Sequence, residues 1–436
     1  MGPRLPDMSE PYSPHLKKLL QQKGKELNYE PIQINIMNND RRDFLKKGTS
    51  LAAGLSLGAV STSASAFEIN PAPKKVPLPQ VEGPNTPKLT MTVSANATES
   101  NMKWIKQFGC DYVHMGGPRD LPWTKEGVRA IMDRFKAQGL TVINMMINFS
   151  GAIIHGTEGR DEEIKKVQDS LIAAGKAGLP VVEYNFYSHR AVEGYYDIVG
   201  RGGVQYLGYD YYRKGQPNPA DNKWNYKTAR KQPDEENMSM AELPPTEREP
   251  AQSAEKAWAN IEYFLKAVIP VAVKAGVRMA LHPNDPPPPM SRGSEQIMST
   301  FKDWKRLCDI VDSPANGMTF DCGVSTEIGE DAVEVCKYLL SRDRISHVHY
   351  RNVIVETPRI KYVEVMIDEG KVDLLNVMYE LVKGKYKYGI WAEHPRDNEF
   401  DTVYKSGGFV SYLYNQSYAR AIFQACMMLQ AGWKPA

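Results

Sequence analysis

Residues 317–351, GMTFDCGVSTEIGEDAVEVCKYLLSRDRISHVHYR, form the repeating unit that decides the fold of this chain. Two short apolar runs, Gly317–Cys322 and Ile345–Arg351, flank a stretch with a helical pattern. Short apolar runs that alternate with helical segments are typical of βα units, in which neighbouring strands run parallel. This stretch therefore predicts a parallel sheet covered by helices.

The same alternation starts at residue 89 and continues toward the C-terminus. Six further strand candidates bring the total to eight: Leu89–Ala95, Tyr112–Met115, Thr141–Ile147, Val181–Phe186, Arg278–His282 and Gly389–Glu393. Helical patterns lie between them, as in Thr124–Gly139, where Thr124 is placed to cap the start of a helix. Eight such units predict an α/β fold, a closed (β/α)8 TIM barrel that forms a single catalytic domain. The first strand lacks a following G-x-G-x-x-G, which disfavours a dinucleotide-binding fold.

Composition and charge exclude several classes of protein. The 436 residues are 42% hydrophobic and 24% charged, which is ordinary for a globular chain. A formal net charge of +2 gives no strong attraction to nucleic acid or to anionic lipid. The five cysteines are odd in number and widely spaced, so a disulfide framework is not expected.

The first 66 residues are expected to be a leader that includes a twin-arginine signal. Arg41 and Arg42 are followed by an apolar run, Leu51–Val60, and by an A-x-A cleavage motif at Ala64–Ala66. The apolar run is shorter than the roughly 20 residues that span a bilayer, so no stable membrane insertion is expected. We predict export to the periplasm by the twin-arginine machinery, and Met37 is a candidate for the true start.

The remaining chain divides into two parts. Residues 67–88 contain six prolines and few apolar residues, which indicates a linker, and residues 89–436 are the predicted barrel domain. Within the barrel, residues 209–250 are polar, contain several prolines and lack steady periodicity. Because they follow the fourth strand, they would emerge at the catalytic face. Two interpretations remain open for them, a lid over the site and a surface excursion.

Four consecutive strands end in residues that suit metal binding. They are His282, Cys322, His349 and Glu393. One ligand at the end of each successive strand places all four on a ring at one end of the barrel, where active sites of this fold lie. Imidazole and thiolate ligands favour a borderline divalent transition ion over Mg²⁺ or Ca²⁺. His347 lies on the same face of its strand as His349, one layer deeper.

These motifs resemble the mannonate dehydratase family of the xylose isomerase-like barrel superfamily. The landmarks occur in order over most of residues 89–430: Val182-Glu183-Tyr184-Asn185-Phe186, His282-Pro283-Asn284-Asp285-Pro286-Pro287, Cys322-Gly323, His349-Tyr350-Arg351-Asn352, Gly370-Lys371-Val372-Asp373-Leu374 and Glu393-His394-Pro395-Arg396. The resemblance implies a hydro-lyase that converts D-mannonate to 2-keto-3-deoxy-D-gluconate and water. It also implies a divalent ion, commonly Mn²⁺, on the four strand-end ligands, with Fe²⁺ or Zn²⁺ as alternatives.

The chain departs from the family pattern at two positions. Glu393 stands where the family usually has Asp, and Phe409 stands where the family has a tyrosine that is associated with catalysis. His394, next to Glu393, is therefore our candidate proton donor or acceptor, with Glu393 as ligand and catalytic carboxylate. If His394 has no such role, Tyr412, Tyr414 and His155 are the remaining candidates.

Further polar residues near the strand ends are candidates for holding the sugar acid. Arginine pairs bidentately with carboxylates, and amides, carboxylates and hydroxyls orient sugar hydroxyls. The candidates are Arg351 and Arg396 for the substrate carboxylate, and Tyr184, Asn185, Asp285 and Asn352 for the hydroxyls.

Two other functions remain open from the sequence. If Glu183 faces inward with Asn185, a different ligand set would favour a metal-dependent sugar isomerase or epimerase. The absence of the expected tyrosine is compatible with a non-catalytic exported sugar-binding barrel. A homo-oligomer is compatible with the sequence.

Overall fold

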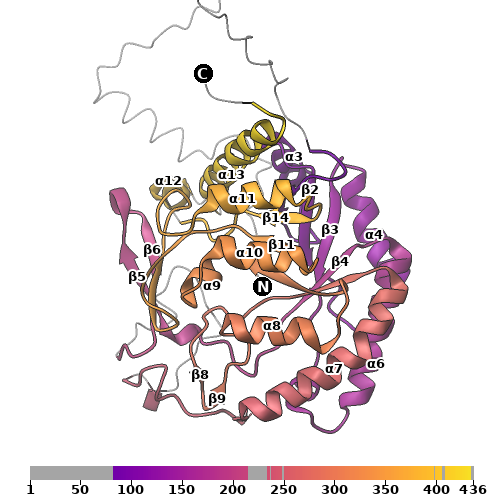
Figure 1. Ribbon diagram of the computed structural model, residues 1–436, viewed down its shortest axis with the longest axis vertical. Coiled ribbons are helices and arrows are strands. Elements are labelled where there is room, and N and C mark those ends of the chain that lie inside the picture. Colours follow the sequence, from indigo (N-terminus) through magenta and orange to yellow (C-terminus); the bar gives the residue numbers. More distant parts are fainter. Residues whose placement is uncertain are drawn as a thin grey trace, which may run out of the picture. The chain divides into compact units, whose positions relative to one another are not determined.

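A computed structural model describes residues 82–214, 233–235, 237–247, 250–396, 398–404 and 408–433 (Figure 1). Eight parallel strands close into a barrel with the order β1-β14-β11-β10-β7-β4-β3-β2, which confirms the predicted fold. Their bounds are β1 Lys88–Thr92, β2 Tyr112–Gly116, β3 Thr141–Met146, β4 Val181–Tyr184, β7 Arg278–Leu281, β10 Asn316–Asp321, β11 Ile345–His349 and β14 Gly389–Trp391. All eight predicted strands exist, and their limits shift by only a few residues.

Helices surround the barrel, as Figure 1 shows; those from α3 to α11 lie between successive barrel strands, and α13 follows the last strand. They are α3 Glu99–Gln107, α4 Lys125–Lys136, α5 Gly151–His155, α6 Arg160–Ala177, α7 Ala254–Ala275, α8 Phe301–Ile310, α9 Cys322–Glu327, α10 Ala332–Ser341, α11 Leu374–Lys383 and α13 Phe409–Gln430. The expected cap on α4 is present, because the Thr124 hydroxyl accepts a hydrogen bond from the backbone N–H of Gly127 at 3.0 Å. None of these helices, nor any other in the described part of the chain, is long and apolar enough to cross a membrane.

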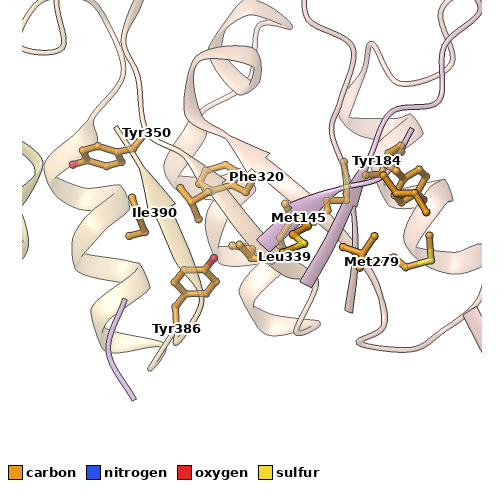
Figure 2. Close-up of a cluster of buried hydrophobic side chains, with 14 of the residues drawn as sticks. Met145, Tyr184, Met279, Phe320, Leu339, Tyr350, Tyr386 and Ile390 are labelled. Carbon is orange, nitrogen blue, oxygen red and sulfur yellow. The ribbon is translucent and has the colours of Figure 1, made fainter. Parts of the chain in front are cut away.

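The main core lies between the outer face of the barrel and the helices. Figure 2 shows part of it, with Tyr184, Met279, Phe320 and Ile390 from the strands among the buried side chains. Side chains alternate along a strand. The apolar residues therefore point toward the helices, and the residues between them point into the barrel interior. Several of those inward positions are polar and buried, for example Glu183.

A small antiparallel sheet projects from the barrel, and the sequence did not predict it. Its order is β12-β13-β6-β5, with β5 Tyr195–Val199, β6 Gln205–Asp210, β12 Val353–Thr357 and β13 Lys361–Glu364. We call these four strands the inserted sheet. They come from two connections that follow barrel strands β4 and β11, and β6 pairs directly with β13.

The inserted sheet bears on the expected excursion at 209–250. The predicted excursion starts within β6, which ends at Asp210. Farther along it, residues 237–247 pack against the inserted sheet through Met240 and Leu243. The excursion therefore begins earlier than expected. Residues 215–232 lie outside the described residues, so the lid remains a prediction. The leader, the twin-arginine signal and the linker up to residue 81 also lie outside them.

Candidate active site

Four neighbouring strands of the barrel bring the predicted ligands to one end. His349 is the last residue of β11, His282 directly follows β7, and Glu393 comes two residues after β14. Because β7, β10, β11 and β14 are adjacent in the barrel, their carboxyl ends meet. His349 and Glu393 are buried and the His282 side chain is 12% exposed, which is typical of a site built into the top of the barrel.

His349 is the centre of this group. Its Nδ1 atom lies 2.9 Å from Glu393 Oε1 and 3.0 Å from His282 Nε2. The other nitrogen of His282, Nδ1, is 2.7 Å from the carbonyl of Pro283, and this contact orients the ring. Two imidazoles and a carboxylate that converge in this way fit a divalent transition ion.

Asp321 lies where the sequence reasoning had placed Cys322. Its Oδ2 is 3.6 Å from His349 Nδ1 and 4.0 Å from His282 Nε2, and Asp321 pairs with His349 in the strand register. Cys322 is buried as the first residue of α9. In the described part of the chain, the groups of converging ligand atoms include Asp321 and do not include Cys322. Cys322 stays a predicted ligand, and Asp321 is a carboxylate that the sequence reasoning missed.

Arg351 lies among the carboxylates of the site. Its guanidinium is 2.7 Å from Glu327, 3.1 Å from Asp321 and 3.2 Å from Glu393, with 2% of the side chain exposed. Burial opposes ionisation of Asp321, but Arg351 and the neighbouring histidines hold its pKa well below the ordinary value. The Arg351 guanidinium is thus paired with acids of the protein itself. We had expected Arg351 to bind the substrate carboxylate, and its surroundings do not favour that role.

His394 borders the same group from a loop above β14. Its φ of +43° turns the backbone, since the strand has ended at Trp391. Nδ1 lies 2.7 Å from Glu364 Oε2, and Nε2 lies 3.6 Å from Glu393 Oε2. Burial alone would lower the pKa of His394, but Glu364 and Glu393 raise it above the ordinary value. The two carboxylates therefore favour the protonated form of His394 at the edge of the proposed metal ligands.

Glu364, the partner of His394, is a functional candidate that the sequence did not indicate. It is the last residue of β13, buried, and it also accepts hydrogen bonds from Tyr195 at 3.2 Å and contacts Arg396 at 3.0 Å. Asp285 belongs to the same group, since the Tyr195 hydroxyl donates to it at 3.0 Å. No motif marked Glu364, because its position depends on the pairing of the inserted sheet.

The other predicted substrate residues have different surroundings. Tyr184 lies in the apolar layer outside the barrel, with ring centroids 6.1 Å from Phe149 and 5.8 Å from Phe264 (Figure 2). Asn352 uses its side chain to bind the backbone of Val353, Ile367 and Val372. The structure therefore does not bring these two residues into the site.

Asn185 and the aromatic candidates also lie in distinct places. The half-buried Asn185 amide is 3.8 Å from the sulfur of Met146. Phe409, at the position of the expected tyrosine, packs on Trp104 at 5.1 Å. Tyr414 is 38% exposed, and its hydroxyl is 3.5 Å from the guanidinium of Arg201. His155 is buried at the end of α5, and Tyr412 is half-buried on α13.

A closed (β/α)8 barrel with imidazoles and carboxylates at the carboxyl ends of adjacent strands defines a class, the metal-dependent barrel enzymes. Comparison with known proteins places the chain within it. The family model for D-mannonate dehydratase (UxuA) matches residues 99–430, so the chain belongs to the mannonate dehydratase family, whose members are metal-dependent hydro-lyases.

Individual relatives agree with this family. A mannonate dehydratase of Streptococcus equi subsp. zooepidemicus is 28% identical over 71% of this chain and 85% of its own length. One of Oceanobacillus iheyensis is 29% identical over 68% of this chain and 85% of its own length. The crystal structure of mannonate dehydratase from Streptococcus suis matches with a TM-score of 0.63 and 24% identity, and covers 80% of this chain and 96% of that one. At that identity the structural match shows the shared fold alone.

Proposed function

We propose that this protein removes water from D-mannonate and yields 2-keto-3-deoxy-D-gluconate. The observation that carries the proposal is the convergence of His282, His349 and Glu393 beside the buried His394–Glu364 pair, in a chain of the mannonate dehydratase family. The first part supplies ligands for an ion, and the second supplies a positioned proton donor. Dehydration of a sugar acid requires both.

The ion would be held by His282, His349 and Glu393, with Asp321 or Cys322 completing the set. Imidazole with carboxylate suits Mn²⁺, Fe²⁺ or Zn²⁺, and we propose Mn²⁺ as the working ion. When bound, such an ion supplies Lewis-acid stabilisation of negative charge on substrate oxygens. Arg351 orients the surrounding acids, because it contacts Asp321, Glu327 and Glu393 at once, and it lowers the pKa of Asp321.

His394 would donate the proton to the departing hydroxyl. The reaction breaks the C–H bond next to the carboxylate, and that proton passes to a basic group. The neighbouring C–O bond breaks, and the hydroxyl leaves as water with the proton from His394. The resulting enol then moves its hydroxyl proton to carbon and becomes the 2-keto acid. Glu364 holds Nδ1 of His394 at 2.7 Å, so Nε2 is the atom directed toward Glu393 and the site. Both carboxylates raise the pKa of His394, which favours the protonated ring that can donate. Arg396 and Asp285, around the same pair, remain our candidates for contact with the substrate.

An epimerase or isomerase is the second candidate, and one observation favours it. Glu183 faces the barrel interior, where its Oε1 is 3.7 Å from Nε2 of His349. Yet Glu183 approaches the opposite nitrogen from the one that meets Glu393 and His282. It therefore need not replace either of them as a ligand, and the dehydratase ligand set stays intact.

The test is a product assay on the full chain after metal removal and restoration. The protein, stripped with a chelator, is supplied with Mn²⁺, Fe²⁺ or Zn²⁺ and incubated with D-mannonate. Formation of a 2-keto-3-deoxy acid, greatest with Mn²⁺, is expected. An epimer of the substrate would establish the second candidate instead. Absence of any product with all three ions, while D-mannonate still binds, would identify a sugar-binding barrel.

We also propose that the protein is exported by the twin-arginine pathway to the periplasm. Support comes from Arg41 and Arg42, the apolar run after them and the Ala64–Ala66 motif. Mass spectrometry of the exported form should find an N-terminus near Phe67. Substitution of both arginines by lysine should leave the precursor unprocessed. Processing that continues in that variant would argue against the twin-arginine route.

A further inference from the structure

A second group of ligand-type side chains lies one layer deeper in the barrel than the candidate active site. Glu183 on β4, His347 on β11 and His349 each offer one ligand atom, and these atoms lie within 4.8 Å of one another. All three residues are buried. The proposed reaction uses neither Glu183 nor His347, so the deeper group requires its own explanation.

The Glu183 carboxylate is fixed by neighbours on two other strands. Thr319 donates a hydrogen bond to Oε1 at 2.7 Å, and Asn144 donates to Oε2 at 2.8 Å. A carboxylate oxygen has more than one lone pair, so each atom retains acceptor capacity after these contacts. Hydrogen-bonded support of this kind is the usual surrounding of a carboxylate that ligates a metal.

His347 is a buried imidazole with unfilled hydrogen-bonding capacity. None of its surface is exposed, and neither ring nitrogen has a hydrogen-bond partner among the described residues. The same holds for both ring nitrogens of His114, whose ring centroid is 5.0 Å from that of His347. Buried polar groups nearly always have partners, so two such rings side by side indicate a ligand that binds between them and the carboxylate.

A glycine on the neighbouring strand leaves space for the His347 ring. Gly389 lies opposite it on β14, and a Cβ atom at that position would be 2.9 Å from His347 Nδ1. Any side chain there would force the ring to move. The absence of a side chain at Gly389 therefore preserves the position of His347 inside the barrel.

His349 faces both groups with different nitrogens. Nδ1 meets Glu393 at 2.9 Å, whereas Nε2 lies 3.7 Å from Glu183 Oε1. Two ligands on a tetrahedral ion with bonds of about 2.1 Å stand roughly 3.4 Å apart, so the deeper pair needs only a small adjustment. One imidazole can then ligate an outer ion through Nδ1 and an inner ion through Nε2, once its ring N–H proton is released to solvent and the ring bridges as imidazolate.

We propose that Glu183, His347 and His349 form a second, inner divalent-cation site, distinct from the outer site at His282 and Glu393. Two imidazoles and one carboxylate favour Zn²⁺ or the chemically similar Co²⁺ over Mg²⁺ and Ca²⁺. His114 stands beside the group as a further imidazole. The inner ion would fix the His349 ring from below, and its existence does not depend on which sugar acid the outer site processes.

The proposal is tested by metal stoichiometry on the full chain. Metal-free protein is titrated with Co²⁺ and followed by visible absorption, and zinc content is measured by mass spectrometry after Zn²⁺ loading. The unmodified protein should bind two equivalents. Glu183→Gln and His347→Gln should each retain one, and His282→Gln should lose the outer ion while keeping the inner one. His155→Gln, a buried histidine outside the barrel interior, is the matched control and should keep two.

A crystal of the Zn²⁺-loaded unmodified protein gives an independent result that does not depend on variants that fold. An anomalous peak among Glu183, His347 and His349 is expected. A water molecule there, with zinc only at His282 and Glu393, would overturn the inner site while leaving the outer one in place. So would a second equivalent of Co²⁺ that persists in both Glu183→Gln and His347→Gln. Loss of both ions in His282→Gln alone would point to a single outer cluster and would equally reject the proposal.

Discussion

The barrel and the inserted sheet contribute to one site in different ways. The barrel supplies His282, His349 and Glu393 from the ends of strands that repeat along the sequence. The inserted sheet supplies Glu364 from a strand that pairs across more than 150 residues of chain, since β13 is hydrogen-bonded to β6. The barrel thus provides the proposed ligands for an ion, and the inserted sheet orients His394, the proposed proton donor. The difference suggests that metal binding and proton transfer can be disrupted separately.

Arg351 connects the two parts. It contacts Glu393 at 3.2 Å on the barrel side and lies 4.0 Å from Glu364 on the inserted-sheet side. Acids from both regions therefore share one buried cation. An unpaired charge is costly in a buried site. Separation of the barrel from the inserted sheet would leave such charges unpaired, so the shared Arg351 favours their present positions.

The largest expected effect is on the barrel ligands. Cys322→Ser should abolish tight metal binding if the thiolate is a ligand, since a serine hydroxyl stays protonated where a thiolate would not. Turnover should fall about 10³-fold with the ion, the scale for loss of a main electrostatic contributor. Metal content and turnover are measured together. Cys336→Ser, a buried cysteine on α10, is the control and should keep the metal.

Asp321→Asn is the companion variant that decides between the two neighbours. If Cys322→Ser retains the metal while Asp321→Asn loses it, the fourth ligand is Asp321, as its 3.6 Å approach to His349 suggests. Metal retained in both variants would remove both residues from the ligand set.

The second prediction separates proton transfer from metal binding. His394→Ala should lower turnover by roughly 10²-fold, the common scale for a positioned acid or base, while metal content stays unchanged. The reason is that His394 lies 3.6 Å from the proposed ligand Glu393 without being part of the central group. Near-normal turnover in this variant would remove His394 from the mechanism and direct attention to Tyr412, Tyr414 or His155.

The third and smaller effect tests the inserted sheet. Glu364→Gln should reduce turnover by about 10-fold to 100-fold, the range for residues that orient a functional group, with metal content preserved. Glu364→Asp should recover part of the loss if a carboxylate on Nδ1 of His394 is what matters. Glu356→Gln, an exposed glutamate of the same sheet, is the matched control. A drop in metal content instead of turnover would show that Glu364 supports the barrel ligands.

Local sequence patterns predicted the barrel well and the inserted sheet not at all. Strands such as Ile345–His349 and helices such as α4 are defined by residues within one repeat, so apolar periodicity and caps reveal them. The pairing of β6 with β13 joins two distant connections, and neither segment carries a signal of its partner. Sequence reasoning therefore could not anticipate Glu364.

Within the site, the types of the residues were easier to predict than the directions in which their side chains point. His282, His349 and Glu393 meet as expected because each ends a strand of the same ring. The structure does not bring Tyr184 to the substrate, because alternation along β4 turns Glu183 inward and Tyr184 toward the helices. Arg351 was expected to bind substrate because arginine suits carboxylates, and it does bind carboxylates, but they belong to the protein.

The smallest expected effect lies at the opposite end of the barrel from the candidate active site. Glu82 is near the start of β1, where the backbone N–H of Leu89 approaches its carboxylate at 3.4 Å. Burial raises the pKa of Glu82 to about 7, although Arg420 and Lys88 act in the other direction. The folded protein then holds this proton more tightly than the unfolded chain does. The stability contributed by Glu82 is thus complete below its ordinary pKa of 4.5 and is lost as pH rises toward about 7.

Urea unfolding at pH 5 and pH 8 should show that Glu82→Gln gains stability relative to the unmodified chain at pH 8 and not at pH 5, with turnover unchanged. Glu158→Gln, at an exposed position, should show no such difference between the two pH values, and an equal gain for both variants would separate the effect from the burial of Glu82.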